Sequence, residues 1–111
     1  MSIGRNLVRM EMPAGLTTLY TVPKAKIAEI KTITTVNRDS TNPAKWFLYL
    51  VKDGDVADNS NVLIPGTDQW DIPDGRNIDY ETWKVLDAET TIQGYSTGQV
   101  TIHIDGALVD A

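Results

Sequence analysis

The chain has 111 residues, no cysteine and a formal net charge of −5 at pH 7. This length fits one domain that buries its own core, and the absence of cysteine excludes a disulfide framework, a thiolate metal site and a thiol nucleophile. The acidic balance argues against nucleic-acid binding, because phosphate contacts need a basic field.

The N-terminal region is interrupted by charge at Arg5, Arg9 and Glu11, so we expect no signal peptide. No run approaches the roughly 18 apolar residues of a membrane span, so no membrane partner is expected. Residues 1–52 carry eight basic and three acidic residues, whereas residues 53–111 carry two basic and twelve acidic ones. This split favours docking between a basic and an acidic face, unless a β-sandwich interleaves the two halves in space.

Residues 1–14 are predicted to form an N-terminal arm or an edge strand, ahead of a β-sandwich domain over residues 15–111. In the stretch "MSIGRNLVRMEMP", apolar residues are interleaved with charged ones. A first strand with a frayed end is one interpretation; the other is an extended arm that adds to the sheet edge of a neighbour. If it is an arm, residues 1–12 are dispensable for folding.

The segment over residues 24–37 is ambiguous, because Ile27, Ile30 and Ile33 recur at helical spacing. A helix here would place two lysines at the positive end of its dipole and end in the β-branched run "TITTV". We therefore predict a strand. Its apolar residues change phase between Ile27 and Val36, which a β-bulge or burial of both faces would absorb.

The later segments read as further strands. "KWFLYLVK" is apolar on both faces and predicts a central strand, "TDQWDI" a short one, and "IDYETWKV" and "TTIQGYST" two more. In "QVTIHIDG", Val100, Ile102 and Ile104 alternate with polar residues, which predicts one core face. Because turn clusters separate short segments, the fold class is an all-β, single-domain antiparallel β-sandwich, jelly-roll-like in form.

The stretch "GYSTG" around Ser96 matches the Gly-x-Ser-x-Gly pattern of a nucleophile elbow. That elbow needs a strand, a turn and a helix, with an acid and then a histidine downstream. Here a strand follows, and Asp105 comes after His103, the only histidine. We predict a hairpin turn closed by Thr97 and Gly98, with no catalytic residue.

The stretch "DGDVADNSN" has the aspartate density of a calcium loop, but Asp58 and Ile64 occupy the EF-hand positions for Gly and Glu. A non-EF site using Asp53, Asp55 and Asp58 stays open beside the simpler interpretation as solvated turn acids. We expect no metal and no cofactor. Among the tryptophans, Trp70 is the one we expect to be most readily exposed, with core packing as the alternative.

Four stretches carry a family resemblance, running from Leu16 to Val109: "LTTLYTVPKAKIAEIKTITTVN", "WFLYLVKDGD", "NVLIPGTDQWDI" and "DAETTIQGYSTGQVTIHIDGALV". Together they resemble short virion proteins of tailed phages, and most of all the head decoration (cement or staple) proteins of epsilon-fifteen-like short-tailed phages. The resemblance implies a jelly-roll-like sandwich that binds the outer surface of the capsid, bridges major capsid proteins and pairs as a homodimer.

The expected protein is thus a non-enzymatic structural component of the virion, assembled in the host cytoplasm, without direct contact to nucleic acid. The residues expected at the capsid or dimer interface are Arg5, Leu7, Arg9, Met10 and Trp70. The alternative is a tail or fibre adaptor that binds a neighbouring tail protein or a host glycan. A small hydrolase is disfavoured because the triad is missing.

Overall fold

The structure is a computed structural model that describes the backbone of residues 5–111 and the side chains from Asn6 onward; the rest of the predicted arm lies outside the described residues. Eight strands make up the fold: β1 (Arg5–Glu11), β2 (Thr17–Thr21), β3 (Lys26–Asn37), β4 (Trp46–Val51), β5 (Val62–Pro65), β6 (Asn77–Leu86), β7 (Thr91–Ser96) and β8 (Val100–Asp110). Residues 5–111 also contain one 3-10 turn, η1, which spans Asp68–Trp70.

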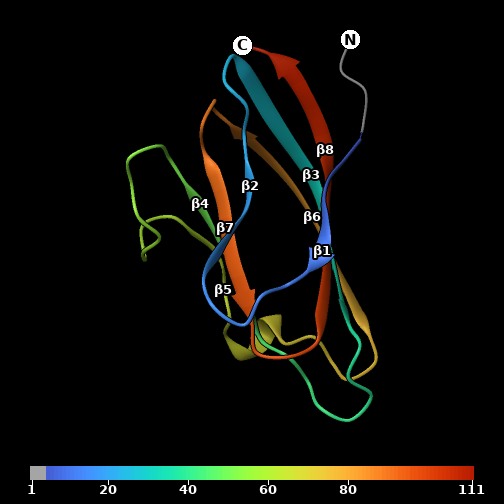
Figure 1. Cartoon of the computed structure of the whole chain (residues 1–111). Coiled ribbons are helices and arrows are strands. Elements are labelled where there is room, and N and C mark those ends of the chain that lie inside the picture. Colours follow the sequence, from blue (N-terminus) through green and yellow to red (C-terminus); the bar gives the residue numbers. More distant parts are fainter. Residues whose placement is uncertain (1–4) are drawn as a thin grey trace.

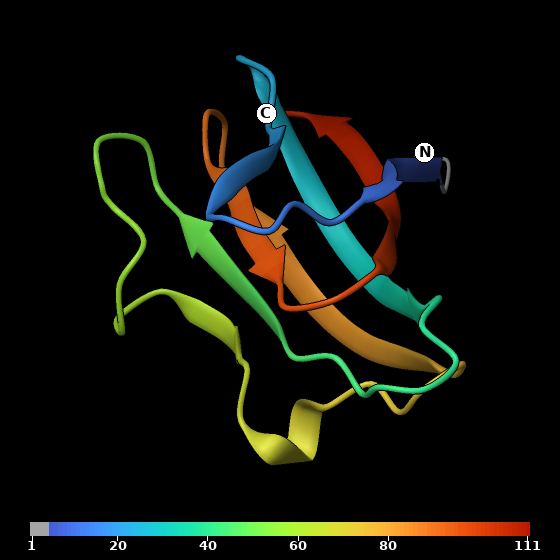
Figure 2. The same cartoon turned by 60° about the horizontal axis from the view of Figure 1, so that its bottom comes forward.

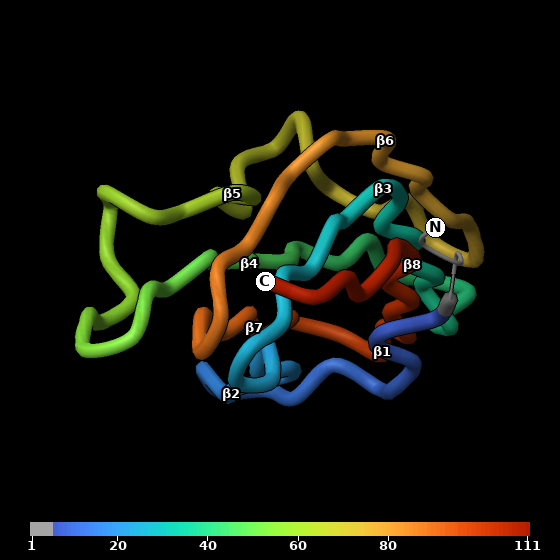
Figure 3. The backbone as a smooth tube through the Cα atoms, turned by 90° about the horizontal axis from the view of Figure 1, so that it is seen from above, coloured from blue at the N-terminus to red at the C-terminus, as the bar shows by residue number. Residues whose placement is uncertain are grey.

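The strands form two antiparallel four-stranded sheets, with the orders β1-β8-β3-β6 and β2-β7-β4-β5. Figures 1 and 3 show the sheets as two layers with the core between them. The pairs β1·β8, β2·β7, β3·β6 and β4·β5 are nested along the chain, and β3·β8 and β4·β7 complete the sheets. This is the strand order of an eight-stranded jelly roll, so the predicted fold class is confirmed.

The nested pairing interleaves the basic and acidic halves of the chain. In each sheet, every hydrogen-bonded neighbour of a strand from residues 1–52 comes from residues 53–111. Basic residues of the first half accordingly pair with acids of the second: Lys24 with Glu89, Lys26 with Asp110, and Lys45 with Asp68 and Asp71. The charge split along the sequence therefore does not become one basic and one acidic face.

Strand β8 follows the predicted alternation. Val100, Ile102 and Ile104 are fully buried, while His103 and Asp105 lie half-buried on the other face. Strand β4 is central in its sheet, as predicted, between β7 and β5. On its outward face, Phe47 stacks on its cross-strand neighbour Tyr95, with ring centroids 4.4 Å apart and the rings nearly parallel. This contact within the sheet partly buries Phe47.

The ambiguous segment is strand β3, as predicted, and of the two alternatives for its phase change it contains a β-bulge. Between the pairs Ile30↔Gly106 and Thr32↔Asp105, strand β3 has one extra residue, Lys31, that β8 does not match. This extra residue resets the alternation, so that Ile30 and Ile33 both face the core. Their spacing of three, which resembled a helix, is therefore a consequence of the bulge.

The bulges of this sheet lie on one line across its strands. Strand β1 has Leu7 as an extra residue beside Asp105 of β8, and on the far side two residues of β6, Thr82 and Trp83, lie opposite Lys31. Gly106 lies on this line at a very close approach, because a Cβ placed there would meet the carbonyl oxygen of Glu29 at 1.8 Å. The sheet therefore bends where β8 has no side chain.

Two local predictions are wrong. The stretch "TDQWDI" forms the 3-10 turn η1 and an isolated bridge, Ala44↔Ile72, because Trp70 N–H closes a tight turn onto the carbonyl of Thr67 at 2.8 Å. The "GYSTG" stretch does not close a hairpin, because β7 and β8 belong to different sheets. The chain crosses between the layers there, and the Ser96 hydroxyl stabilises the corner by donating to the carbonyl of Gly98 at 3.0 Å.

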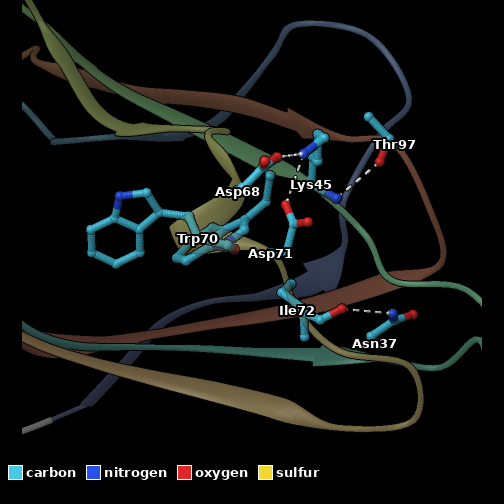
Figure 4. Close-up of polar contacts among 8 residues, drawn as sticks. Asn37, Lys45, Asp68, Trp70, Asp71, Ile72 and Thr97 are labelled. Carbon is cyan, nitrogen blue, oxygen red and sulfur yellow. Dashed lines mark hydrogen bonds and ion pairs between the residues drawn. The ribbon is translucent and has the colours of Figure 1, made fainter.

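The "NRDSTNP" loop between β3 and β4 is ordered by two side chains. Asn37, which is buried, donates to the carbonyl of Asn42 and to the carbonyl of Ile72, and Figure 4 shows the contact with Ile72. The carboxylate of Asp39 accepts from the N–H groups of Thr41 and Asn42. The hydrogen bond from the Thr41 backbone is the largest cause that lowers the pKa of Asp39 to about 2. The ionised form of Asp39 thus holds this turn.

Thr35 offers a test of the core. Its hydroxyl is fully buried and finds no hydrogen-bond partner in the described part of the chain. We expect Thr35→Val to raise the free energy of unfolding by about 1 kcal/mol, because it removes an unsatisfied polar group at almost constant volume. Urea unfolding would measure this. Thr34→Val, on the half-buried outward face of β3, is the control, with a change within about 0.5 kcal/mol; a destabilised Thr35→Val variant would contradict the assignment.

Candidate interaction surface

The most prominent apolar group on the described surface lies on strand β6. Four large hydrophobic residues are exposed: Leu16, Val56, Trp83 and Val85. Only Trp83 and Val85, which are 67% and 54% exposed, are neighbours on one face of one strand. With Lys31, whose ammonium lies 5.5 Å from the centroid of the Trp83 ring, they form what we call the β6 patch.

The β-alternation and the bulge together place this patch. Along β6, Ile78 and Tyr80 face the sandwich and pack against its core, whereas Asp79 and Glu81 point outward. Trp83 lies two residues after Glu81, and residues two apart in a strand share a face, so Trp83 lies on the outward face. The extra residues opposite Lys31 bring the lysine stem alongside the indole ring, where a cation–π contact holds it.

The patch is also at a sheet edge. Strand β6 pairs with β3 on one side, and no described strand pairs with its other side. Figure 2 shows β6 along the border of its sheet, far from the border formed by β1. An exposed tryptophan on an edge strand is the kind of residue that anchors protein–protein interfaces, where aromatic side chains are enriched.

The predicted interface residues of the N-terminal segment lie on the opposite edge strand, β1. Leu7 and Met10 are half-buried and pack against the core, and Arg9 is exposed opposite His103 of β8. The side chain of Arg5 lies outside the described residues. The structure therefore places Arg9 on the surface, while Leu7 and Met10 lie partly within the fold.

Strand β1 and Met12, the residue that follows it, also contribute to the core. Val8 and Met12 are 5% and 4% exposed, and Met12 N–H donates to the carbonyl of Val100 at 2.8 Å. A truncation of residues 1–12 would remove both side chains and the outer partner of β8. Because burial of this kind stabilises a domain, we now expect this truncation to lower the free energy of unfolding.

Trp70, the tryptophan expected to be exposed, is half-buried in an aromatic cluster. Its ring meets those of Trp46 and Tyr80 edge-on, with centroids 6.4 and 5.2 Å away. Its carbonyl accepts a hydrogen bond of 2.7 Å from Trp46 Nε1. Trp70 thus links η1 to the core, and Trp83 is the tryptophan that sequence reasoning missed. Its parity with Asp79 and Glu81 was the signal that could have identified it.

Lys45 anchors the same turn from the surface. Its ammonium lies between Asp68 and Asp71, at 2.8 and 3.0 Å, and its backbone N–H donates to the Thr97 hydroxyl (Figure 4). The hydrogen bond that the Lys45 ammonium donates to Asp68 is the largest cause that raises the pKa of Lys45, and the same bond lowers the pKa of Asp68. Since this cluster is internally paired, its role is structural.

The residues considered for catalysis or metal binding are not assembled into a site. Ser96 is 2% exposed and its hydroxyl is engaged within the corner, while His103 lies on the outward face of the other sheet. Within residues 5–111, no group of three His, Asp or Glu side chains is positioned to hold a metal ion. Asp58 of the candidate calcium loop instead accepts hydrogen bonds from Ser60.

No protein-family model and no curated protein matches this chain. In the described residues there is no helix of the length and apolar character needed to cross a membrane.

Proposed function

We propose that this chain is a non-enzymatic structural protein of a phage virion, which binds the outer surface of the capsid and bridges major capsid proteins. The sequence resemblance suggests the class, and the jelly roll is a fold that viral capsid proteins use often. Since a fold alone does not imply a function, the observation that carries the proposal is the β6 patch. A decoration protein needs an adhesive surface, and the patch supplies one.

The physical case rests on the exposed area of Trp83. A large aromatic ring that is 67% exposed leaves apolar surface in water, and contact with a partner would remove it. Val85 extends the same apolar surface along the strand, and Lys31 adds a charge at its rim. Specific contact needs on the order of 1,000 Å² of buried surface in total, so the patch would be the centre of a larger interface.

The mechanism is stabilisation by mass action. A protein that binds the assembled shell but not its free subunits shifts the equilibrium toward the shell. A copy that contacts two capsid subunits at once also gains from the high effective concentration of the second site. The proposal includes pairing of two copies on the shell as a homodimer.

The direct test is a binding experiment with shells assembled from the major capsid protein of the same phage. The chain is expected to sediment with these shells, and electron microscopy is expected to locate paired densities on their outer surface. Purified tails serve as the comparison. Retention on tails but not on shells would refute the capsid assignment and support the adaptor alternative.

The β6 patch makes a specific prediction for Trp83→Ala. We expect this variant to bind shells about 30-fold more weakly, since truncation of a hot-spot aromatic costs about 2 kcal/mol or more. Sedimentation with shells over a concentration series would measure the change. Leu16→Ala, which removes a 50% exposed side chain ahead of β2, is the matched control and should bind like the parent chain. Equal affinities for Trp83→Ala and Leu16→Ala would show that the patch is not the adhesive surface.

A further inference from the structure

A cleft of about 360 Å³ opens beside the β6 patch, where the loop of residues 52–61 meets the edge of the sandwich. Figure 3 shows this loop projecting from the two layers between β4 and β5. The cleft combines apolar side chains from the sheet of β4 and β5 with charged side chains from the loop and from β6. Its lining residues are Leu50, Lys52, Asp55, Ser60, Asn61, Val62, Leu63 and Lys84.

Lys84 reaches this cleft because of its place in the strand. It pairs with Ile30, which is 1% exposed, and residues directly opposite each other in a sheet share a face. Lys84 therefore points to the inner side of its sheet, while its chain neighbours Trp83 and Val85 point outward. Since β6 is an edge strand, the ammonium emerges between the two layers and not in the core.

The charge of the cleft differs from that of the chain. Lys24, Lys26 and Lys45 each form an ion pair, whereas Lys52 and Lys84 form none with the described residues. Asp55 is the only acid of the lining, so two lysines face one carboxylate in a chain with a net charge of −5. The cleft is thus a locally positive site above apolar side chains.

The loop that forms one wall is held by its own hydrogen bonds. Asn61 accepts from the N–H of Asp58 and donates to the carbonyl of Val56, and Ser60 donates to the carboxylate of Asp58. The backbone of Asn61 also accepts from Leu50 N–H of β4 at 2.9 Å. Because these groups are already paired, the charged side chains of the lining, Lys52, Lys84 and Asp55, are the ones without an ion pair to the described residues, and the two lysines outnumber the single carboxylate.

From this arrangement we infer that the cleft receives an acidic side chain, flanked by aliphatic residues, of a capsid subunit. Charge complementarity selects the carboxylate, and Leu50, Val62 and Leu63 select the aliphatic neighbours. A partner segment that crosses the edge of β6 would contact Trp83 on one side and Lys84 on the other. The inference deepens the proposed function and rests on it, since it names the chemistry of the same partner.

The test compares charge-removing and charge-keeping variants in binding to assembled shells. Lys52→Gln combined with Lys84→Gln is expected to bind about tenfold more weakly at low salt, as the loss of two partly exposed charge contacts implies. Its affinity should also fall less steeply as the salt concentration rises. Lys52→Arg combined with Lys84→Arg keeps both charges and should bind within about threefold of the parent chain.

Lys24→Gln is the matched control, because it removes one exposed charge at the turn before β3. It should leave binding unchanged. Failure of the parent chain to bind shells would overturn the proposed function itself. The cleft inference alone would be overturned if the parent chain binds shells and the double glutamine variant binds them equally well. It would also be overturned if the double arginine variant loses as much affinity as the double glutamine variant. Urea midpoints of all variants should match that of the parent.

Discussion

Replacing Gly106 with alanine is expected to lower the free energy of unfolding by about 3 kcal/mol, which is at the upper end for an overpacked site. The new Cβ would lie 1.8 Å from the carbonyl oxygen of Glu29 and 2.9 Å from its carbonyl carbon. Both atoms belong to the backbone of β3, the strand that pairs with β8 and β6. No flexible side chain can move aside, so the central strands must separate.

Urea unfolding followed by circular dichroism would measure this loss. Gly15→Ala is the matched control, because a Cβ at Gly15 meets no atom within 4 Å. Its free energy of unfolding should stay within about 0.5 kcal/mol of the parent value. If Gly106→Ala were as stable as Gly15→Ala, the close approach of β8 to β3 at the line of bulges would be wrong.

The second large effect is expected for Trp46→Ala, at about 4 kcal/mol. Trp46 is fully buried, and it fills the core between the sheets while its Nε1–H donates to the carbonyl of Trp70. The substitution opens a large cavity and leaves that carbonyl without its partner. With a typical stability of about 5–15 kcal/mol, such a variant would unfold at markedly lower urea concentrations.

Trp83→Ala provides the comparison, since it is the same substitution at an exposed site. Its free energy of unfolding should fall by no more than about 1 kcal/mol, the contribution of the contact with Lys31. The two variants thus separate stability from binding: Trp46→Ala should impair folding, and Trp83→Ala should impair shell binding with the fold intact. Equal destabilisation of the two would mean that Trp83 belongs to the core.

The sequence predicted most where a pattern is local. Alternation identified β8, and the β-branched run "TITTV" identified β3, whose phase change left a β-bulge and burial of both faces as alternatives. Pairing between distant strands has no such local signal, so the strand order had to come from the structure. The corner at Ser96 shows the difference: the turn was correctly located, but a hairpin and a crossing between layers use the same turn residues.

The interface residues were harder to predict, because exposure depends on tertiary contacts. Trp70 lies between turn residues and was expected to be the most readily exposed tryptophan, with core packing as the alternative; it is half-buried, with its ring against those of Trp46 and Tyr80. Leu7 and Met10 have a pattern that an arm and an edge strand share. Only Trp83 carried a usable signal, because it follows Asp79 and Glu81 in the alternating series of residues on the outward face. A large apolar residue is not expected in such a series, so the signal was missed.

The nested pairing of the jelly roll also sets an order of events during synthesis. Strands β4 and β5 are separated only by residues 52–61, so they can meet early, whereas β1 must wait for β8, the last of the eight to be made. Strand β3 can pair with β6 first, but its other edge also waits for β8. Closing such long loops is entropically costly, and folds rich in distant contacts fold slowly. Until β8 arrives, β1 has no partner and one edge of β3 stays unpaired, and a nascent copy is therefore exposed to mispairing with its neighbours on the same polysome.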